Sequence, residues 1–293
     1  MDECGGADSL RTVLAVADGV GEYKLTSMAN TGKILVSMTS YPGRIKNVGM
    51  AIFMVLTKQT LPPDEVHLWL TKTQFPGGEH SLPADLQSIL KSPKVFLHWT
   101  EKDTYCHKRH GIFHIADPED LVFVIDDDTY YDSKLIETVV AKHKQYPKAI
   151  ISYNRASKHC YKGKHMLYPI SPSGGPYINV GRINGNSMFP VKVVPKEIYA
   201  IENEPIRDKC TPICDESWIT PWLVYYDVPI IWLNFGWGTE IDPVHIQMST
   251  GLVSQTHKVE SNGLERRDNW LAAVLDAFPE IKQKYVNLFN YSK

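Results

Sequence analysis

Short apolar runs and helical hydrophobic periods alternate along the first half of the chain. The runs have the length and composition of strands and occupy residues 34–39, 65–70, 95–99, 121–125 and 149–153. Between them, apolar residues recur with a helical period over residues 45–56 and 133–145. The run at 121–125 is apolar on both faces, which is typical of a central parallel strand. This alternation predicts an α/β fold with helices that flank a mixed, mostly parallel sheet.

The second half of the chain has a less regular pattern. Residues 158–190 are rich in Gly, Ser, Pro, Asn and Tyr, and we predict a long functional loop there, because disordered linkers contain few aromatic residues. A helix is predicted to begin at Asp215, followed by a strand at 228–233 and a helix at 267–278.

The domain organisation follows from the same pattern. Residues 1–31 show no period and few large apolar side chains, so we predict a weakly ordered N-terminal extension. Residues 32–293 then form a single domain with two halves, 32–155 and 156–293.

Composition narrows the class of protein. Of 293 residues, 43% are hydrophobic and 22% charged, as in globular proteins. A formal net charge of −2 argues against a nucleic-acid partner, because binding phosphates needs a basic face. The sequence shows neither a membrane-spanning apolar stretch nor a secretory leader. Five cysteines, an odd number without a paired framework, favour a reducing compartment, so we expect a cytoplasmic protein.

The three aspartates Asp126, Asp127 and Asp128 follow the apolar run at 121–125 directly. In open α/β sheets, ligands bind just beyond the carboxyl ends of the strands. Side chains alternate in extended chain, so Asp126 and Asp128 are expected on one side and Asp127 on the other. Neighbouring carboxylates repel each other, and a divalent cation turns this repulsion into binding. Oxygen ligands favour Mg²⁺ or Mn²⁺ as the cofactor.

Three other interpretations of the aspartates compete with a metal site. They could cap a helix that begins near Asp132. An EF-hand loop fails, because Tyr130 and Tyr131 stand where Asp or Asn and Gly are needed. An aspartyl nucleophile would need partner Lys or Ser motifs that the sequence does not show. Since there is also no P-loop and no Rossmann glycine motif, an enzyme whose metal bridges the phosphates of a nucleoside diphosphate accounts best for the cluster.

Three motifs in order resemble those of a known enzyme class. Asp126-Asp127-Asp128 resembles the D-x-D motif of GT-A glycosyltransferases. Residues 37–45, SMTSYPGRI, and 59–70, QTLPPDEVHLWL, resemble the opening of a bacterial GT-A group that makes surface polysaccharides of the O-antigen or capsule type. The resemblance covers residues 33–155, and 180–275 more loosely. It implies that 32–155 is the nucleotide-sugar-binding half of the domain and 156–293 the acceptor-binding half.

The resemblance implies a GT-A fold and a metal-dependent glycosyltransferase. Such an enzyme moves a sugar from a nucleoside-diphosphate donor, with a UDP-sugar favoured, to a glycan or lipid-linked glycan acceptor, with inversion. A lipid-linked acceptor would bring the protein to the inner surface of the membrane. The sequence carries no signal for an oligomeric state.

By this resemblance, Asp128 ligates the metal, and Asp126 binds the metal, the ribose or both. Asp127 belongs to the donor site as a residue that supports these two. His257 is the first candidate for a further metal ligand and His245 the second.

The resemblance also implies a donor site around the first strand. Thr39, Tyr41 and Arg44 would hold the base and ribose, with Tyr41 stacking and Arg44 on a phosphate or uracil. Lys108 and its neighbour Arg109 could neutralise the donor phosphates. A solvent-exposed helix start for Arg44, and a solvated basic face for the other two, are the alternatives.

The acceptor side is expected around Asp215 and Glu216, which resemble the acidic motif of inverting enzymes. One of the two would remove the acceptor proton, aided by burial that raises its pKa, while Asp215 could instead be a helix N-cap. The remaining residues expected on the sugar and acceptor side are Gly174, Gly175, Asn184, Gly185, Asn186 and Trp218.

Two other functions compete with this one. A nucleotidyltransferase would make the sugar nucleotide, but it needs a glycine-rich, basic loop after the first strand, of which residues 41–44 are a poor version. A non-catalytic carbohydrate-binding protein agrees with seven tryptophans and fifteen tyrosines, yet it has no need of acidic residues at a strand end.

Overall fold

A computed structural model describes most of the chain from Gly32 onward. The described residues are 32–152, 159–161, 164–166, 177–178, 183, 186–233, 244–245 and 263–290. The predicted N-terminal extension, residues 1–31, lies outside them. None of the helices in this part of the chain is long and apolar enough to cross a membrane.

The strands are β1 (Ile34–Thr39), β2 (Glu65–Thr71), β3 (Val95–Thr100), β4 (Leu121–Val124), β5 (Thr129–Tyr130), β6 (Ile150–Ser152), β7 (His159–Tyr161), β8 (Lys164–Met166), β9 (Tyr177–Ile178), β10 (Ser187–Pro190), β11 (Pro229–Trp232) and β12 (Val244–His245). The α-helices are α1 (Ile45–Lys58), α2 (Ala84–Ile89), α3 (Leu135–Gln145), α4 (Glu204–Cys210), α5 (Asp215–Tyr225), α7 (Gly263–Ala277) and α8 (Pro279–Asn290). Short 3₁₀ helices are η1 (Lys72–Gln74), η2 (Gly78–Ser81), η3 (Tyr105–His114), η4 (Val191–Val193), η5 (Lys196–Ile198) and η6 (Ile201–Asn203).

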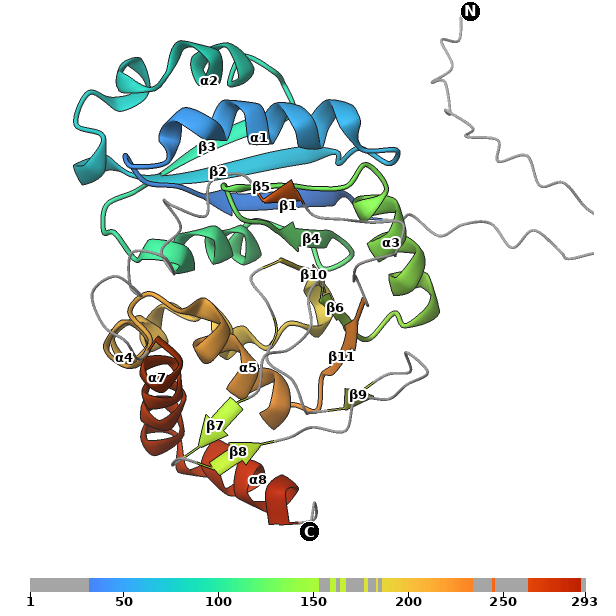
Figure 1. Cartoon of the computed structure of the whole chain (residues 1–293), viewed down its shortest axis with the longest axis vertical. Helices are drawn as coiled ribbons and strands as arrows, with labels where there is room; N and C mark the ends of the chain where they lie inside the picture. Colours follow the sequence, from blue (N-terminus) through green and yellow to red (C-terminus); the bar gives the residue numbers. More distant parts are fainter. Residues whose placement is uncertain are drawn as a thin grey trace, which may run out of the picture. The chain divides into compact units, whose positions relative to one another are not determined.

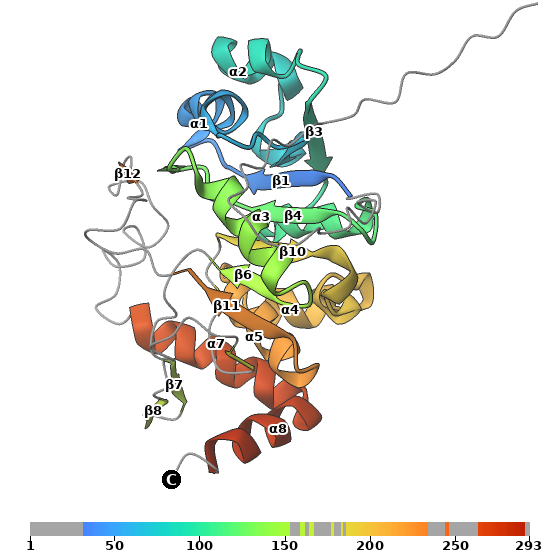
Figure 2. The same cartoon turned by 90° about the vertical axis from the view of Figure 1, so that its right-hand side faces the viewer.

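Eight strands form the central sheet in the order β3-β2-β1-β4-β10-β6-β11-β9 (Figure 1 and Figure 2). Strands β3, β2, β1 and β4 are parallel neighbours, and β11 is parallel to β6. Strand β10 lies antiparallel between β4 and β6, and β9 is antiparallel to β11. The predicted α/β fold with a mixed, mostly parallel sheet is confirmed.

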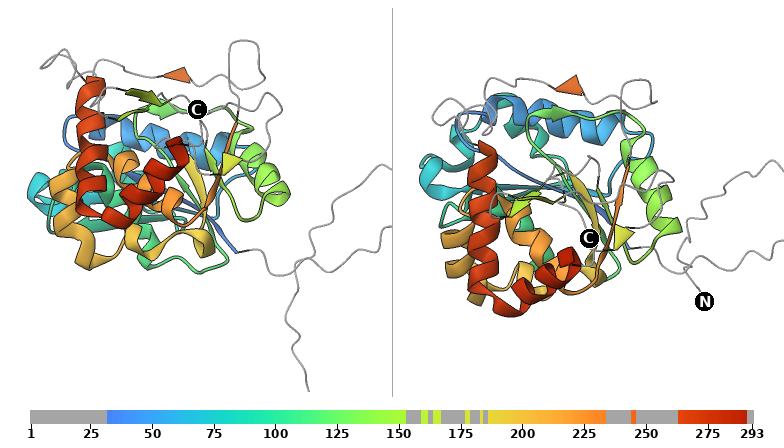
Figure 3. Two further views of the ribbon diagram at one scale, coloured as in Figure 1. Left: turned by 90° about the horizontal axis from the view of Figure 1, so that it is seen from below. Right: turned by 60° about the horizontal axis from the view of Figure 1, so that its bottom comes forward.

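Helices cover both faces of this sheet. In β4, Phe123 contributes to the core beneath α1, α2 and α3, whereas Val122 and Val124 face the core on the other side. This alternation is the two-residue period of a strand buried on both faces. Helices α1 and α2 lie together over the β1–β3 part of the sheet (Figure 1). On the opposite face η3 and α5 pack against the sheet, and α7 and α8 cover α5 (Figure 3).

The predicted elements of the first half are confirmed within one or two residues. In the second half, the long loop predicted over residues 158–190 is wrong where the structure describes it. The short strands β7, β8 and β9 lie within this range, and residues 187–190 form β10 in the middle of the sheet. The predicted helix at 267–278 is α7, and it is followed by a second helix, α8, whose first residue is Pro279. Proline is well tolerated at a helix start, where its missing N–H has no partner to lose.

The parallel strands place four loops at one edge of the sheet. Residues after β1, β2, β3 and β4 emerge together there, since their carboxyl ends point the same way. The first loop turns directly into α1: Tyr41 accepts backbone hydrogen bonds from Arg44 and Ile45 at 2.9 and 3.0 Å. This edge carries the candidate site.

Candidate functional site

A pocket of about 250 Å³ opens at the carboxyl ends of β1–β4. Its lining combines cationic, acidic and aromatic side chains from all four loops: Thr39, Ser40, Tyr41, Arg44, Gln74, Asp103, Tyr105, Cys106, Lys108, Arg109, Asp126 and Asp127. Predicted donor-site residues therefore converge on one pocket, although they come from separate segments of the chain.

Each of the three consecutive aspartates contacts an arginine, and Asp127 and Asp128 share the same one. The Arg44 guanidinium donates from Nη1 to Asp128 Oδ2 at 2.5 Å and reaches Asp127 Oδ1 from Nη2 at 2.6 Å. Asp126 Oδ1 accepts a hydrogen bond from Arg109 Nη1 at 2.7 Å. Charge compensation in this cluster is thus supplied by the chain itself.

Asn186 and Tyr131 fix the orientation of Asp126. The Asn186 amide donates to Asp126 Oδ2 at 3.0 Å, and its oxygen accepts from the Asp126 backbone N–H at 3.1 Å. The Tyr131 hydroxyl donates to the same Asn186 oxygen at 2.6 Å. Asn186, which was expected on the sugar side, is buried and holds an aspartate instead.

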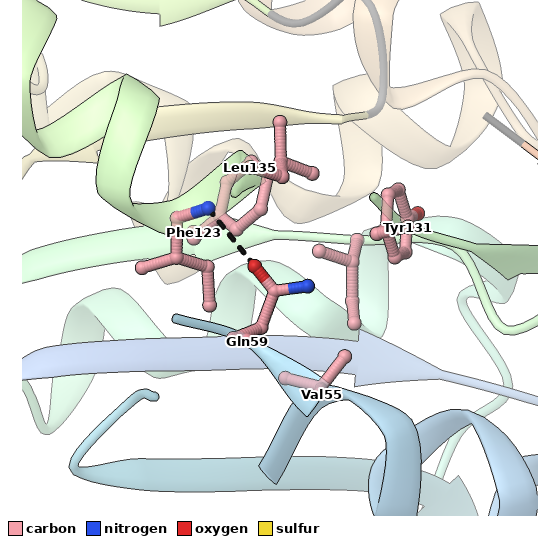
Figure 4. A pocket seen from close by; sticks show the side chains of 7 residues that line it. Val55, Gln59, Phe123, Tyr131 and Leu135 are labelled. Atoms are coloured by element: carbon pink, nitrogen blue, oxygen red, sulfur yellow. Dashed lines mark hydrogen bonds between the residues drawn. The ribbon is translucent and has the colours of Figure 1, made fainter. Parts of the chain in front are cut away.

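Tyr131 itself lies in a mostly apolar layer (Figure 4). Its ring lies near Phe123 and Leu135, and Gln59, the residue that follows α1, completes the layer. Gln59 accepts from the Ile136 backbone N–H at 3.1 Å and donates to the Asp132 carbonyl at 2.7 Å. This layer therefore anchors the acidic loop to both α1 and α3.

Arg109 connects the two acidic motifs, which are far apart in the sequence. Besides Asp126, it binds the Ile125 carbonyl through Nη1 at 3.1 Å. On its other side, Nε and Nη2 contact Asp215 Oδ2 at 2.9 and 2.7 Å. His110 Nε2 approaches the same Asp215 oxygen at 2.8 Å. Arg109, His110 and Asp215 are all more than nine-tenths buried.

These contacts set the protonation of Asp215. Burial alone would raise the pKa of Asp215, but Arg109 and His110 hold it well below its usual range. Burial also lowers the pKa of His110, so the imidazole is neutral and donates its Nε2 proton to Asp215. The expectation of a base with a raised pKa is therefore wrong for Asp215.

The aspartates of the acidic run behave differently. Burial raises the pKa of Asp127 to about 6, although Arg44 acts in the opposite direction. Burial also raises the pKa of Asp128. Glu216, the other candidate base, is half-buried and accepts a weak hydrogen bond from Cys214 Sγ at 3.8 Å.

Lys108 and Arg109 do not form a solvated basic face. Lys108 is 4% exposed, and its Nζ donates to Asp103 Oδ1 at 2.6 Å and to Thr71 Oγ1 at 3.0 Å. Arg44 precedes α1, but it is not solvent-exposed there, since 11% of its side chain is accessible. Both of these alternatives are wrong.

Thr39 and Tyr41 lie on the β1 side of the pocket. The Thr39 hydroxyl donates to the Trp69 carbonyl at 2.8 Å, which ties the end of β1 to β2. The Tyr41 ring lies 5.3 Å from the Arg44 guanidinium carbon. A nucleobase stacked on Tyr41 would therefore lie next to the Arg44 guanidinium.

Two further sequence interpretations are corrected. Trp218 is 1% exposed, donates to the Ile198 carbonyl at 2.8 Å and packs against Trp222 and Phe278 in the core, so a contact with the acceptor is wrong. Neither acidic motif caps a helix. Asp215 is the first residue of α5, and α3 begins at Leu135, beyond the three aspartates.

Several predicted residues are outside the part of the chain that the structure describes. These are Gly174, Gly175, Asn184, Gly185 and His257. His245, the second candidate for a metal ligand, is in β12, whose pairing with β5 sets it opposite Thr129. The backbone at His245 is thus in register with the residue that follows Asp128.

The acidic run suits a hard cation in its donor chemistry. Its donors are carboxylate oxygens, and Asp126 and Asp128 have side chains that are 33% and 22% exposed. Within the described ranges, no group of three or more His, Cys, Asp or Glu side chains is arranged to hold a metal ion. Arg44 and Arg109 contact the oxygens that a cation would use.

Sequence reasoning missed Gln74, Asp103, Tyr105 and Cys106. Gln74 Nε2 donates to Asp103 Oδ2 at 2.7 Å, and Tyr105 adopts a positive φ of 52°. Gln74 and Asp103 stand three residues beyond the ends of β2 and β3. The strand-end rule that found the aspartates would have found them as well.

Buried polar atoms on this pocket also point to a ligand. Arg44 Nε and Gln74 Oε1 have no hydrogen-bond partner among the described residues. Unsatisfied buried groups are rare in folded proteins and tend to occur at functional sites.

The comparisons with known proteins identify no family. No protein-family model matches the chain, and no curated protein matches it. Among solved structures, residues 1–349 of Staphylococcus aureus TarS share 13% identity, with a TM-score of 0.46 over 83% of this chain and 70% of that chain. The same TarS fragment in complex with UDP-GlcNAc has a TM-score of 0.41 at 13% identity, over 70% of this chain and 56% of that chain. This likeness is too distant to transfer a function.

Proposed function

We propose that this protein is a metal-dependent glycosyltransferase that takes a sugar from a nucleoside-diphosphate donor. The observation that carries the proposal is the convergence of three cationic side chains with two acidic ones in one pocket at the carboxyl ends of four parallel strands: Arg44, Lys108, Arg109, Asp126 and Asp127. A diphosphate is strongly anionic, and buried cations next to an aromatic face suit a nucleotide. The uridine nucleotide is favoured by the resemblance of the motifs.

Mn²⁺ or Mg²⁺ would be held by Asp126 and Asp128. His245 is the preferred third ligand over His257, because β12 brings its backbone into register with Thr129. When bound, the cation supplies positive charge that stabilises the departing diphosphate. Arg109 keeps Asp126 oriented toward this site, and Lys108, paired with Asp103, places a further ammonium group on the pocket wall.

We assign the general base to Glu216. Asp215 is occupied by Arg109 and His110 and is a poor proton acceptor, as its lowered pKa indicates. Glu216 follows it in the first turn of α5 and is only half-buried. A carboxylate there would take the proton of the acceptor hydroxyl in an inverting transfer.

The acceptor class rests on the motif resemblance alone. A glycan or lipid-linked glycan of a surface polysaccharide fits the proposed reaction, and with a lipid carrier the enzyme would work at the inner face of the membrane. Candidate residues for the sugar and acceptor side of the site are Gly174, Gly175, Asn184 and Gly185.

Calorimetric titration tests the proposal. UDP and GDP are titrated into the purified protein with Mn²⁺ and, separately, with EDTA. We expect one nucleotide to bind with Mn²⁺ and to lose most of its affinity in EDTA and in Asp128→Asn. Folded protein that binds neither nucleotide would refute a nucleoside-diphosphate donor. Nucleotide binding that is equally strong in EDTA would support the nucleotide donor and refute the metal dependence.

A further inference from the structure

Arg44 has a position that helix stability does not explain. It precedes α1 at the N-cap position, where the helix dipole is positive and a cation is unfavourable. Its side chain is nevertheless 89% covered and lies on the pocket. A buried cation in such a place must be stabilised by anions.

The two arginines of the site are held in different ways. Arg109 is fixed from two directions, by Asp126 and the Ile125 carbonyl on one side and by Asp215 on the other. Arg44 is held on one side alone, by Asp127 and Asp128 at 2.6 and 2.5 Å. Its Nε has no hydrogen-bond partner among the described residues. Arg44 can therefore leave its carboxylates without breaking a network that spans the site.

We propose that Arg44 is a resident counter-cation which competes with the divalent cation for Asp128, and which turns to the donor diphosphate once the metal has entered. This inference rests on the proposed function. Asp128 Oδ2 is the atom that Arg44 Nη1 contacts, and it is also one of the oxygens that a metal needs. Two cations that share one carboxylate repel each other, so the occupancy of one weakens the other.

This competition makes metal and nucleotide binding cooperative. Metal alone must displace Arg44 from Asp128 and leave the buried guanidinium with Asp127 as its one remaining carboxylate, which lowers the affinity for the metal. A nucleoside diphosphate gives the displaced guanidinium a new anionic partner. The nucleotide should therefore strengthen metal binding, and by linkage the metal should strengthen nucleotide binding by the same factor.

The test is a Mn²⁺ titration of the full chain at pH 8, in which electron paramagnetic resonance reports free Mn²⁺, with and without UDP. Arg44→Gln removes the competing charge and Arg44→Lys keeps it. Lys192→Gln is the matched control, because Lys192 forms a solvent-exposed ion pair with Glu119 at 3.0 Å. Thermal melting followed by circular dichroism shows which variants are folded.

In the absence of UDP, we expect Arg44→Gln to bind Mn²⁺ at least about tenfold more tightly than the unchanged protein. UDP should then enhance its Mn²⁺ affinity less, whereas Lys192→Gln should behave like the unchanged protein. If Arg44→Gln does not fold, Arg44→Lys takes its place. A lysine offers one point contact instead of a two-pronged one, so it should compete less and tighten Mn²⁺ binding several-fold.

Mn²⁺ affinity that is unchanged or weaker in the folded Arg44 variant, while UDP still binds, overturns the inference and leaves the proposed transferase intact. Failure of every variant and of the unchanged protein to bind UDP with Mn²⁺ refutes the proposed function itself.

Discussion

The acidic run at the end of β4 and the buried Asp215 at the start of α5 contain the same residue type in opposite electrostatic states. Asp127 is nearly inaccessible and shares a single guanidinium with Asp128, so burial dominates and raises its pKa to about 6. Asp215 is buried to a similar degree, yet Arg109 and His110 hold its pKa well below the usual range. The contacts, and not burial, separate the two: Asp215 receives two N–H groups of Arg109 and the His110 ring, whereas Asp127 shares Arg44 with Asp128.

The difference suggests a division of labour. A carboxylate saturated by fixed partners serves as an anchor, whereas carboxylates that share one detachable cation remain available to a ligand. Arg109 belongs to both regions, because it binds Asp126 and Asp215. Substitutions at these positions should therefore separate structural from ligand-binding roles.

Arg109→Met should have the largest effect. It leaves Asp215 buried without its main cation and removes the partner of Asp126, and breaking a buried pair in this way costs about 3–5 kcal/mol of unfolding free energy. Urea denaturation measures the loss. Lys102→Met, at an exposed pair with Asp208, should cost at most about 1 kcal/mol. Similar losses in the two variants would show that the Arg109 bridge has no special importance.

The pH dependence of stability should have opposite signs in the two regions. Asp127 has a folded pKa of about 6 against an ordinary value of 3.8, so between these values the folded protein retains a proton that the unfolded chain has lost. Its contribution falls as pH rises through that window, by up to about 3 kcal/mol. Asp215, with a lowered folded pKa, contributes stability at neutral pH that is lost as pH falls below its unfolded value.

Asp127→Asn and Asp215→Asn test these signs in EDTA by denaturation across pH 3.5–8. Relative to the unchanged protein, Asp127→Asn should gain stability as pH rises from about 4 to about 6. Asp215→Asn should be destabilised at neutral pH and approach the unchanged protein in acid. Curves that shift in the same direction for both variants would contradict the contrast between the regions.

Glu216→Gln should reduce turnover strongly and binding little. Loss of a general base lowers kcat by about 10²-fold or more, and the amide keeps the size of the side chain. The measurement is sugar transfer with the donor that titration identifies, beside UDP affinity. The opposite result would assign the general base to Asp215. In that case Glu216→Gln stays active, whereas Asp215→Asn folds and binds UDP but has lost turnover.

The sequence predicts the first half of the fold well because its strands are continuous apolar runs and its helices are amphipathic. It fails at β10, where Ser187–Pro190 is only four residues long and follows a Gly- and Asn-rich stretch, so its place in the sheet depends on pairing with β4 and β6. Periodicity describes neighbours along the chain, and this strand is specified by neighbours across the sheet.

The candidate site shows the same limit. The aspartates, Tyr41 and Arg44 could be found because they follow strands in recognisable motifs. The ion pairs of the site could not be found in this way. Arg109–Asp215 and Arg44–Asp128 join segments that only the folded chain brings together. Trp218 was misassigned for the same reason, because its position next to an acidic motif says nothing of its burial in the core.

The smallest effect is expected from Tyr131→Phe, which removes one hydroxyl behind the acidic run. That hydroxyl donates to Asn186 and accepts from the Asp126 backbone N–H at 2.9 Å, so its loss should cost about 1 kcal/mol of unfolding free energy. Asn186→Ala removes the other half of this network, and the double variant should lose less than the sum of the two single losses, because both act on Asp126. If orientation of Asp126 matters for the metal, Mn²⁺ affinity in the presence of UDP should fall several-fold in Asn186→Ala and less in Tyr131→Phe. If the two losses of unfolding free energy are additive and Mn²⁺ affinity is unchanged, Tyr131 and Asn186 contribute only ordinary packing. Arg109 would then be the residue that orients Asp126.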